Sequence, residues 1–168
     1  PPPPMFTPYK IGNLTLQNRV VVAPMCQYSA DDGTPTDWQL VHLGNFAKGG
    51  AGLVITEMTN VSPEGRISHK CAGMYKPEHV PAWKRIVDFV HENSNSKICV
   101  QLGHAGRKAS CNIGWVERGS FLKDDAWSIL APSAIPFGPE SGVPKEMDRT
   151  DMDKVRDDYV KSAKMAAE

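Results

Sequence analysis

The segment from residue 20 to residue 28 reads Val20-Val21-Val22-Ala23-Pro24-Met25-Cys26-Gln27-Tyr28. Its four small or β-branched apolar residues are typical of a buried strand in a parallel sheet, and Pro24 removes a ladder donor and ends the strand. A thiol and a phenol, Cys26 and Tyr28, follow at once. Because ligands gather beyond the carboxyl ends of strands in α/β folds, both side chains are candidates for a site. The alternative for Cys26 is an inert buried thiol.

Two further strands and three helices follow this segment. The second strand is predicted at 53–56 and the third at 97–102. The first helix opens at a capping box, Thr36 to Gln39, and the second follows Pro77 with an apolar stripe. A second capping box, Thr150-Asp151-Met152-Asp153, predicts a third helix that reaches Glu168. Its predicted apolar positions are Met152, Val155, Tyr159 and Ala163.

The resulting order of strand, helix, strand, helix, strand, helix predicts a parallel sheet covered by helices. Alternation around Gly12-Asn13, between Tyr9 and Gln17, predicts a hairpin before the first strand. Three units alone leave one face and one edge of a sheet bare. The pattern therefore favours a truncated chain, either of a doubly wound sheet or of an eight-stranded barrel.

Composition excludes several classes of protein. The chain has 168 residues, of which 40% are hydrophobic, and its 19 Lys and Arg residues balance 19 Asp and Glu residues. This balance argues against binding to nucleic acid or to an anionic membrane surface. No apolar run approaches the length of a membrane span and no signal peptide opens the chain, so we expect a cytoplasmic protein. The four cysteines lack a C-x-x-C pair, which indicates free thiols and no metal site.

Unusual residues cluster after each predicted strand. They are Pro24, Met25, Cys26 and Tyr28 after the first; Glu57, Met58, Thr59 and Arg66 after the second; and Gln101, His104, Arg107 and Lys108 after the third. This convergence on one rim predicts an active site. An amide such as that of Gln101 offers a donor and an acceptor, which suits a uracil-like ring, although it could also be a satisfied core amide. Glycine-rich nucleotide motifs and the serine hydrolase elbow are absent.

Four ordered motifs make the chain similar to a known family. They are Ala23-Pro24-Met25-Cys26-Gln27-Tyr28-Ser29, Pro63-Glu64-Gly65-Arg66, Gln101-Leu102-Gly103-His104-Ala105-Gly106-Arg107-Lys108 and Ala131-Pro132-Ser133-Ala134-Ile135. Together they resemble the Old Yellow Enzyme family, in its thermophilic-like branch, from Met5 onward. The resemblance implies an FMN-containing (β/α)8 barrel that takes hydride from NAD(P)H and passes it to an α,β-unsaturated carbonyl compound. The chain would hold the first three βα units of this α/β barrel, after the N-terminal hairpin.

The same resemblance implies roles for particular residues. The Pro24, Met25 and Cys26 backbone would lie along the isoalloxazine, with the Cys26 thiol tuning its potential, and Gln101 would bond the pyrimidine edge. Tyr28 and Lys108 would reach the substrate. Met58 departs from the family, which usually has a small residue beside the flavin at this position.

Other parts of the family's site would lie beyond Glu168. These are the paired substrate-binding residues, the tyrosine proton donor and the phosphate clamp, so residues 1–168 alone are expected to turn over little or no substrate. Residues 1–4 would form a Pro-rich linker and residues 5–168 the barrel portion of a protein that is a homo-oligomer when complete. Three runs also look similar to the reductase half of monooxygenase–reductase fusions acting on aminobenzoyl-CoA or salicylyl-CoA. A dihydroorotate dehydrogenase-like or aldolase-like barrel, or a non-catalytic scaffold, remain alternatives.

Overall fold

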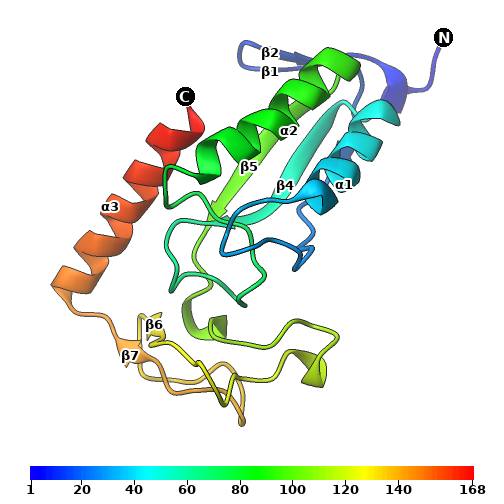
Figure 1. Cartoon of the computed structure of the whole chain (residues 1–168). Helices are drawn as coiled ribbons and strands as arrows, with labels where there is room; N and C mark the ends of the chain where they lie inside the picture. The colour runs from blue at the N-terminus through cyan, green and yellow to red at the C-terminus, as the bar shows by residue number, and fades with distance from the viewer.

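A computed structural model describes residues 1–168, with the exception of the Arg118 side chain. Its centre is a parallel three-stranded sheet in the order β3-β4-β5. The strands are β3 (Val21–Val22), β4 (Leu53–Asn60) and β5 (Lys97–Gly103), and the helices beside them are α1 (Asp37–Lys48), α2 (His79–Asn93) and α3 (Arg149–Ala166). All loops that follow the strands gather at one end of the sheet (Figure 1). The predicted α/β architecture and strand direction are confirmed.

Helices α1 and α2 cover one face of the sheet, as Figure 1 shows. The predicted capping box is present, because Thr36 caps α1 and the Gln39 side chain accepts from the Thr36 backbone N–H at 2.8 Å. Trp83, Ile86 and Val90 of α2 are buried in a core that includes Leu43 of α1 and Val54 of β4. Burial of this stripe is the main favourable term that holds the helices to the sheet.

The opposite face of the sheet is uncovered in this chain. Val21 is 47% exposed, and the Cys99 and Gln101 side chains of β5 are also exposed. The prediction of a buried first strand was therefore too strong: β3 has two residues, and only its helix-facing side chain, Val22, packs against the core. Alternate strand residues point to opposite faces, so this bare surface is the one that does not face α1 and α2.

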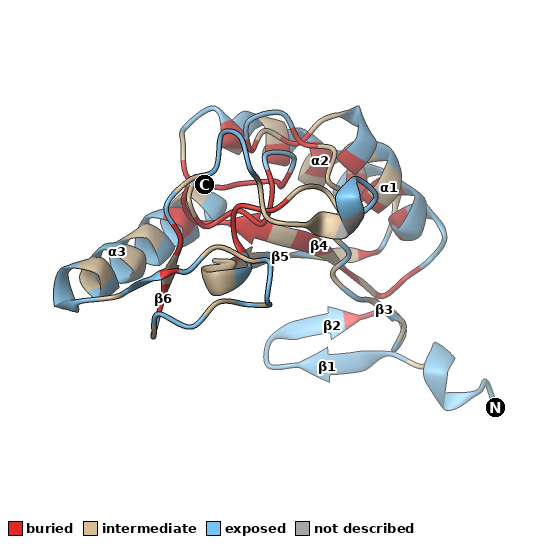
Figure 2. Ribbon diagram, turned by 90° about the horizontal axis from the view of Figure 1, so that it is seen from below, coloured by how far each residue is buried: buried red, intermediate tan, exposed pale blue. Residues whose placement is uncertain are grey.

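The predicted hairpin is formed by β1 (Tyr9–Ile11) and β2 (Leu14–Leu16), which pair antiparallel. Gly12, at the turn between them, has a φ of +55°, a conformation that glycine adopts without steric cost. The hairpin is almost wholly exposed and lies away from the buried centre of the molecule (Figure 2). The chain enters it through η1 (Pro4–Phe6), a single 3₁₀ turn.

A long irregular segment links β5 to α3. It contains η2 (Gly106–Lys108), η3 (Glu117–Gly119), β6 (Leu130–Ala131) and β7 (Lys145–Glu146), and β6 and β7 pair parallel.

The start and the buried face of α3 differ from the prediction. Asp148 is the N-cap and forms a capping box with Asp151, so the helix begins two residues before the predicted cap at Thr150. The predicted apolar stripe is shifted around the helix. Met152 is 46% exposed and Tyr159 37% exposed, whereas Ser162, seven residues after Val155 and so on the same side of the helix, is fully buried. The Ser162 hydroxyl donates to the Val61 carbonyl at 3.4 Å, which ties α3 to the loop after β4.

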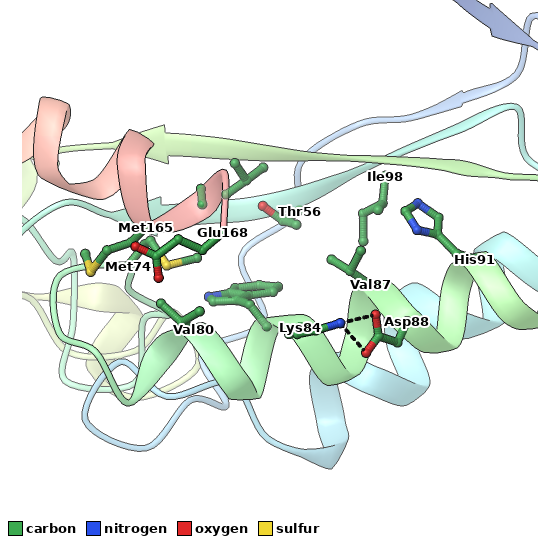
Figure 3. A pocket seen from close by; sticks show the side chains of 13 residues that line it. Thr56, Met74, Val80, Lys84, Val87, Asp88, His91, Ile98, Met165 and Glu168 are labelled. Atoms are coloured by element: carbon green, nitrogen blue, oxygen red, sulfur yellow. Dashed lines mark hydrogen bonds and ion pairs between the residues drawn. The ribbon is translucent and has the colours of Figure 1, made fainter.

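A cavity of about 320 Å³ lies between α2, the end of α3 and the helix-facing side of the sheet (Figure 3). Its walls include Trp83, Val87 and Met165, and Lys84 pairs with Asp88 at its rim. It contains none of the site residues predicted from the sequence. In the part of the chain that the structure describes, no helix is both long and apolar enough to cross a membrane.

One histidine is buried in its neutral form and makes the fold sensitive to acid. His79 is fully buried; its Nδ1 accepts from the Tyr75 N–H at 3.3 Å, and its Nε2 lies 3.2 Å from the Asp32 carbonyl, to which it donates. Burial lowers its pKa below the ordinary value of 6.5. As the pH falls through that value, the unfolded imidazole binds a proton that the folded one rejects, so stability falls.

We therefore expect the free energy of unfolding, measured with urea, to decrease between about pH 7.5 and about pH 5.5. His79→Asn keeps an acceptor for the Tyr75 N–H and reduces this slope. A smaller slope remains, because burial also lowers the pKa of His42 and His104. His91→Asn, at an exposed position on α2, is the control and keeps the full slope. Equal slopes for His79→Asn and the unchanged protein would contradict this account.

Candidate active site

Side chains from different strands and loops meet at the carboxyl end of the sheet. Cys26 and Tyr28 pack with Met58 around a buried cluster made by Ile67, Cys71 and Cys111. Met58 lies within β4, two residues before its end, so the predicted strand 53–56 was too short. We call Cys26, Tyr28, Met58, Gln101 and Lys108 the mouth.

Gln101 reaches the mouth through strand register. It is paired with Met58 across β4 and β5, so the two side chains lie on the same face of the sheet. The Gln101 backbone N–H donates to Thr56 Oγ1 at 3.1 Å, just after the register shift between Ile55 and Met58. Its side chain is exposed, which leaves an amide donor and acceptor open to a ligand.

Tyr28 adopts an uncommon backbone conformation, with a φ of +49°. Its ring meets the Trp115 ring edge to face, with centroids 5.6 Å apart. Trp115 is 67% exposed and comes from the long segment after β5. Sequence reasoning did not identify Trp115, because no motif or periodicity surrounds it.

Beyond Tyr28, a cavity of about 340 Å³ is lined by Lys108, Phe121, Phe137 and Glu140, among others. The Lys108 ammonium lies 5.9 Å from the centroid of the Phe137 ring. A cation and aromatic rings therefore stand together on the side of Tyr28 that faces the long segment.

Both reactive groups of the mouth stay protonated at neutral pH. Burial raises the pKa of the Cys26 thiol to about 11; Cys71 and Glu57 add to the shift, whereas the Met58 backbone N–H and Lys108 oppose it. Burial likewise raises the pKa of the Tyr28 phenol to about 12. The mouth therefore presents a neutral thiol and a neutral phenol, each able to donate a hydrogen bond.

A buried carboxylate lies directly behind the mouth. Glu57 is 2% exposed; its Oε2 accepts from the Gln27 backbone N–H at 3.1 Å and its Oε1 accepts from Gln39 Nε2 at 3.0 Å. Burial raises the pKa of Glu57 above its ordinary value of 4.5, and the hydrogen bonds from Gln39 and from the Gln27 N–H oppose this shift without cancelling it. The sequence did not predict this link between α1 and the mouth, although a glutamate at the end of an apolar strand and a capping-box glutamine were its two visible parts.

Three other predicted rim residues have structural partners instead. Arg66 is 9% exposed, and its guanidinium lies 5.6 Å from the Trp127 ring centroid. Arg107 donates to the Ile135 carbonyl at 2.7 Å and thereby fixes the loop after β6. His104 accepts from the Gly106 N–H at 3.0 Å through Nδ1. These contacts give Arg66, Arg107 and His104 structural roles in the loops beside the mouth.

Pro24 and Met25 connect β3 to Cys26, and Met25 is exposed beside the turn. Its carbonyl accepts from Gln27 Nε2 at 2.8 Å. Among the described residues, no group of three or more His, Cys, Asp or Glu side chains is arranged to hold a metal ion.

Comparison with known proteins identifies relatives along almost the whole chain. It is 42% identical to an NADPH dehydrogenase of Listeria monocytogenes, over 98% of this chain and 45% of that protein. It is 41% identical to an NADH:flavin oxidoreductase of Gibberella zeae, over 96% of this chain and 40% of that protein. The chain therefore spans less than half the length of these curated relatives.

The solved structures of morphinone reductase and of an Old Yellow Enzyme are also similar to this chain. Morphinone reductase superposes with a TM-score of 0.82 at 27% identity, over 98% of this chain and 45% of that one. Old Yellow Enzyme from Pichia sp. AKU4542 has a TM-score of 0.82 at 31% identity, over 97% and 42%. The three βα units are thus part of a (β/α)8 barrel, as predicted. The model of the NADH:flavin oxidoreductase / NADH oxidase family matches residues 4–168, and the chain belongs to that family.

Proposed function

We propose that this chain is part of an FMN-dependent NAD(P)H oxidoreductase that reduces the C=C bond of an α,β-unsaturated carbonyl compound or CoA thioester. One observation carries the proposal: β3, β4 and β5 bring Cys26, Met58 and Gln101 to one end of a parallel sheet. Family membership supports the same reading. Because the chain covers under half of its relatives, the activity belongs to the protein at their length.

The residues at the mouth fit a flat flavin ring. Met58 is larger than the small residue expected beside it, and Gly103 on the neighbouring strand makes room for it. A Cβ at Gly103 would overlap Met58 Cγ and lie 2.8 Å from Met58 Sδ. Met58 therefore lies back against β5, and this leaves the exposed face of Gln101 available for the ring.

FMN, when bound, accepts hydride from NAD(P)H and delivers it to the β-carbon of the substrate. The protein supplies orientation and electrostatics around it. Gln101 would bind the pyrimidine edge through its amide, and the backbone from Pro24 to Cys26 would hold the ring. The Cys26 thiol, neutral at this position, would tune the potential of the flavin. Tyr28, also neutral, and Lys108 orient the substrate carbonyl.

The remaining roles belong to residues outside this chain. We propose that the proton donor and the phosphate-binding groups follow Glu168, so residues 1–168 alone turn over little substrate. We propose that residues 1–4 act as a linker and residues 5–168 as the barrel portion. We also propose that a monooxygenase domain precedes this barrel in the complete protein and that the complete protein is a homo-oligomer.

The test uses the protein at the length of its relatives, purified with FMN in excess. We expect an oxidised-flavin absorbance that NADPH or NADH bleaches under argon and that an enone or aryl-CoA thioester restores. Protein that remains colourless after addition of FMN would reject the proposal.

Gln101→Leu removes the amide and keeps the side-chain volume. We expect FMN to bind about fivefold more weakly, the weight of one hydrogen bond of about 1 kcal/mol, as measured by quenching of flavin fluorescence. Cys99→Ala, two residues earlier on the same face of β5, is the control and leaves the affinity unchanged. Equal affinities for Gln101→Leu and Cys99→Ala would exclude Gln101 from the flavin site.

Gly103→Ala tests whether the Met58 side chain packs against Gly103 of β5. The added methyl group drives Met58 from its place, at a cost of about 1–3 kcal/mol in the free energy of unfolding. Met58→Ala in the same protein relieves the clash, so the two substitutions are strongly coupled in a double-mutant cycle. Gly114→Ala, where a Cβ meets nothing within 4 Å, is the control and changes stability little. Additive effects of Gly103→Ala and Met58→Ala would contradict this packing.

A further inference from the structure

The turn that carries Cys26 and Tyr28 is hydrogen-bonded to Glu57 of β4 and to the first turn of α1. Gln27 stands between these two residues, and its backbone N–H donates to Glu57 Oε2. Trp38 adds an exposed bond, from its Nε1 to Gln27 Oε1 at 2.9 Å. Tyr28 keeps its φ of +49° in this setting, and uncommon conformations persist where the surrounding structure over-determines them.

The two partners of Glu57 both donate hydrogen bonds, so the side chain at position 57 must offer two acceptors. A backbone N–H and a side-chain NH₂ are donors without a lone pair, and each faces one carboxylate oxygen. Gln39 cannot reverse its amide, because its Oε1 already accepts from the Thr36 N–H. An amide at position 57 would turn its NH₂ hydrogens toward a donor on one side. An ionised carboxylate presents a full acceptor to both partners, and a protonated carboxyl would be the weaker acceptor on one side.

No basic side chain of the described residues neutralises this carboxylate. Its pKa responds to burial, to Gln39 and to the Gln27 N–H, and to no cation. The titratable and charged groups that share its surroundings at the mouth are Cys26, Tyr28, Cys71 and Lys108. A fixed negative charge here favours the neutral thiol and phenol, because a second negative charge nearby is disfavoured.

We propose that Glu57 is the positioning residue of the mouth: its carboxylate ties the Gln27 backbone to α1 and β4, and so fixes where Cys26 and Tyr28 stand. Its charge adds to the burial that disfavours ionisation of both of these groups. The link to hydride transfer rests on the proposed function, whereas the positioning of the turn does not.

The test exchanges the two partners. Glu57→Gln places donor against donor, and Gln39→Glu places two carboxylates together in a buried site, so each single substitution lowers the melting temperature by several degrees. In the double variant Gln39→Glu/Glu57→Gln, the new amide donates to the new carboxylate and still accepts from the Gln27 N–H. The new carboxylate also accepts from the Thr36 N–H at the start of α1, where negative charge is favoured. The double variant should therefore recover most of the lost stability.

A second measurement follows the turn itself. Amide hydrogen exchange at Gln27, read by NMR, should be about tenfold faster in Glu57→Gln and return toward the original rate in the double variant. Trp38→Phe, which removes only the exposed bond to the Gln27 side chain, is the matched control and leaves this rate nearly unchanged. Additive losses of stability, or a Gln27 amide that exchanges equally fast in the double variant and in Glu57→Gln, would overturn the positioning role.

A third measurement separates charge from position. Alkylation of Cys26, quantified by peptide mass spectrometry against the exposed Cys99 as internal reference, should be about twofold or more faster in Glu57→Gln at a pH below the thiol's pKa. The double variant keeps part of this increase although its turn is restored, because the charge has moved to α1. A pH profile of Cys26 identical in all variants would refute the electrostatic role. None of these readouts needs flavin, so a protein that fails to bind FMN could still confirm the role of Glu57.

Discussion

A buried carboxylate that must satisfy two donors is the constraint on which this structure depends. Glu57 lies within β4, three residues before its end, and joins the helix start at Gln39 to the turn at Gln27. The turn at Gln27 has no regular structure and α1 begins only at Asp37, so the two hydrogen bonds of Glu57 connect both to the central strand β4. The desolvation of the carboxylate is offset in part, because both its oxygens accept a hydrogen bond.

The parallel sheet places the turn that Glu57 fixes beside the other loops of the mouth. Strands β3, β4 and β5 run in the same direction, so their carboxyl ends share one edge and their loops contribute to one surface. Register then sets which side chains meet, as with Met58 and Gln101. The face that carries Gln101 is uncovered here, and the chain spans less than half the length of its relatives. The described residues thus form one wall of the site proposed for the complete barrel.

Local rules predicted the elements that local chemistry determines. The Thr36–Gln39 capping box, the Gly12-Asn13 hairpin and the three strands are confirmed, because each depends on residues close in sequence. The start of α3 was misplaced because Asp148 and Thr150 both qualify as N-caps, and ion pairs from Lys145 to Asp148 and Asp151 lie around the observed one.

The rest depends on contacts between distant segments. Met152 and Tyr159 were predicted to face the core, but spacing within a helix does not say which face meets β5. The roles of Arg66 and Arg107 were hidden for the same reason, since their partners Trp127 and Ile135 lie far along the chain. The grouping of Cys26, Tyr28 and Met58 has structural support, whereas their roles toward a flavin remain predictions.

The most direct measurement of the central claim is light-driven oxidation by bound FMN in the protein at the length of its relatives, with the modified residues mapped by mass spectrometry. Because excited flavin oxidises nearby sulfur, the account predicts early oxidation of Met25, Cys26 and Met58. Met152, exposed on α3 away from the mouth, should react far more slowly. Oxidation of Met152 as early as that of Met58 and Cys26 would mean that the flavin does not lie against this wall.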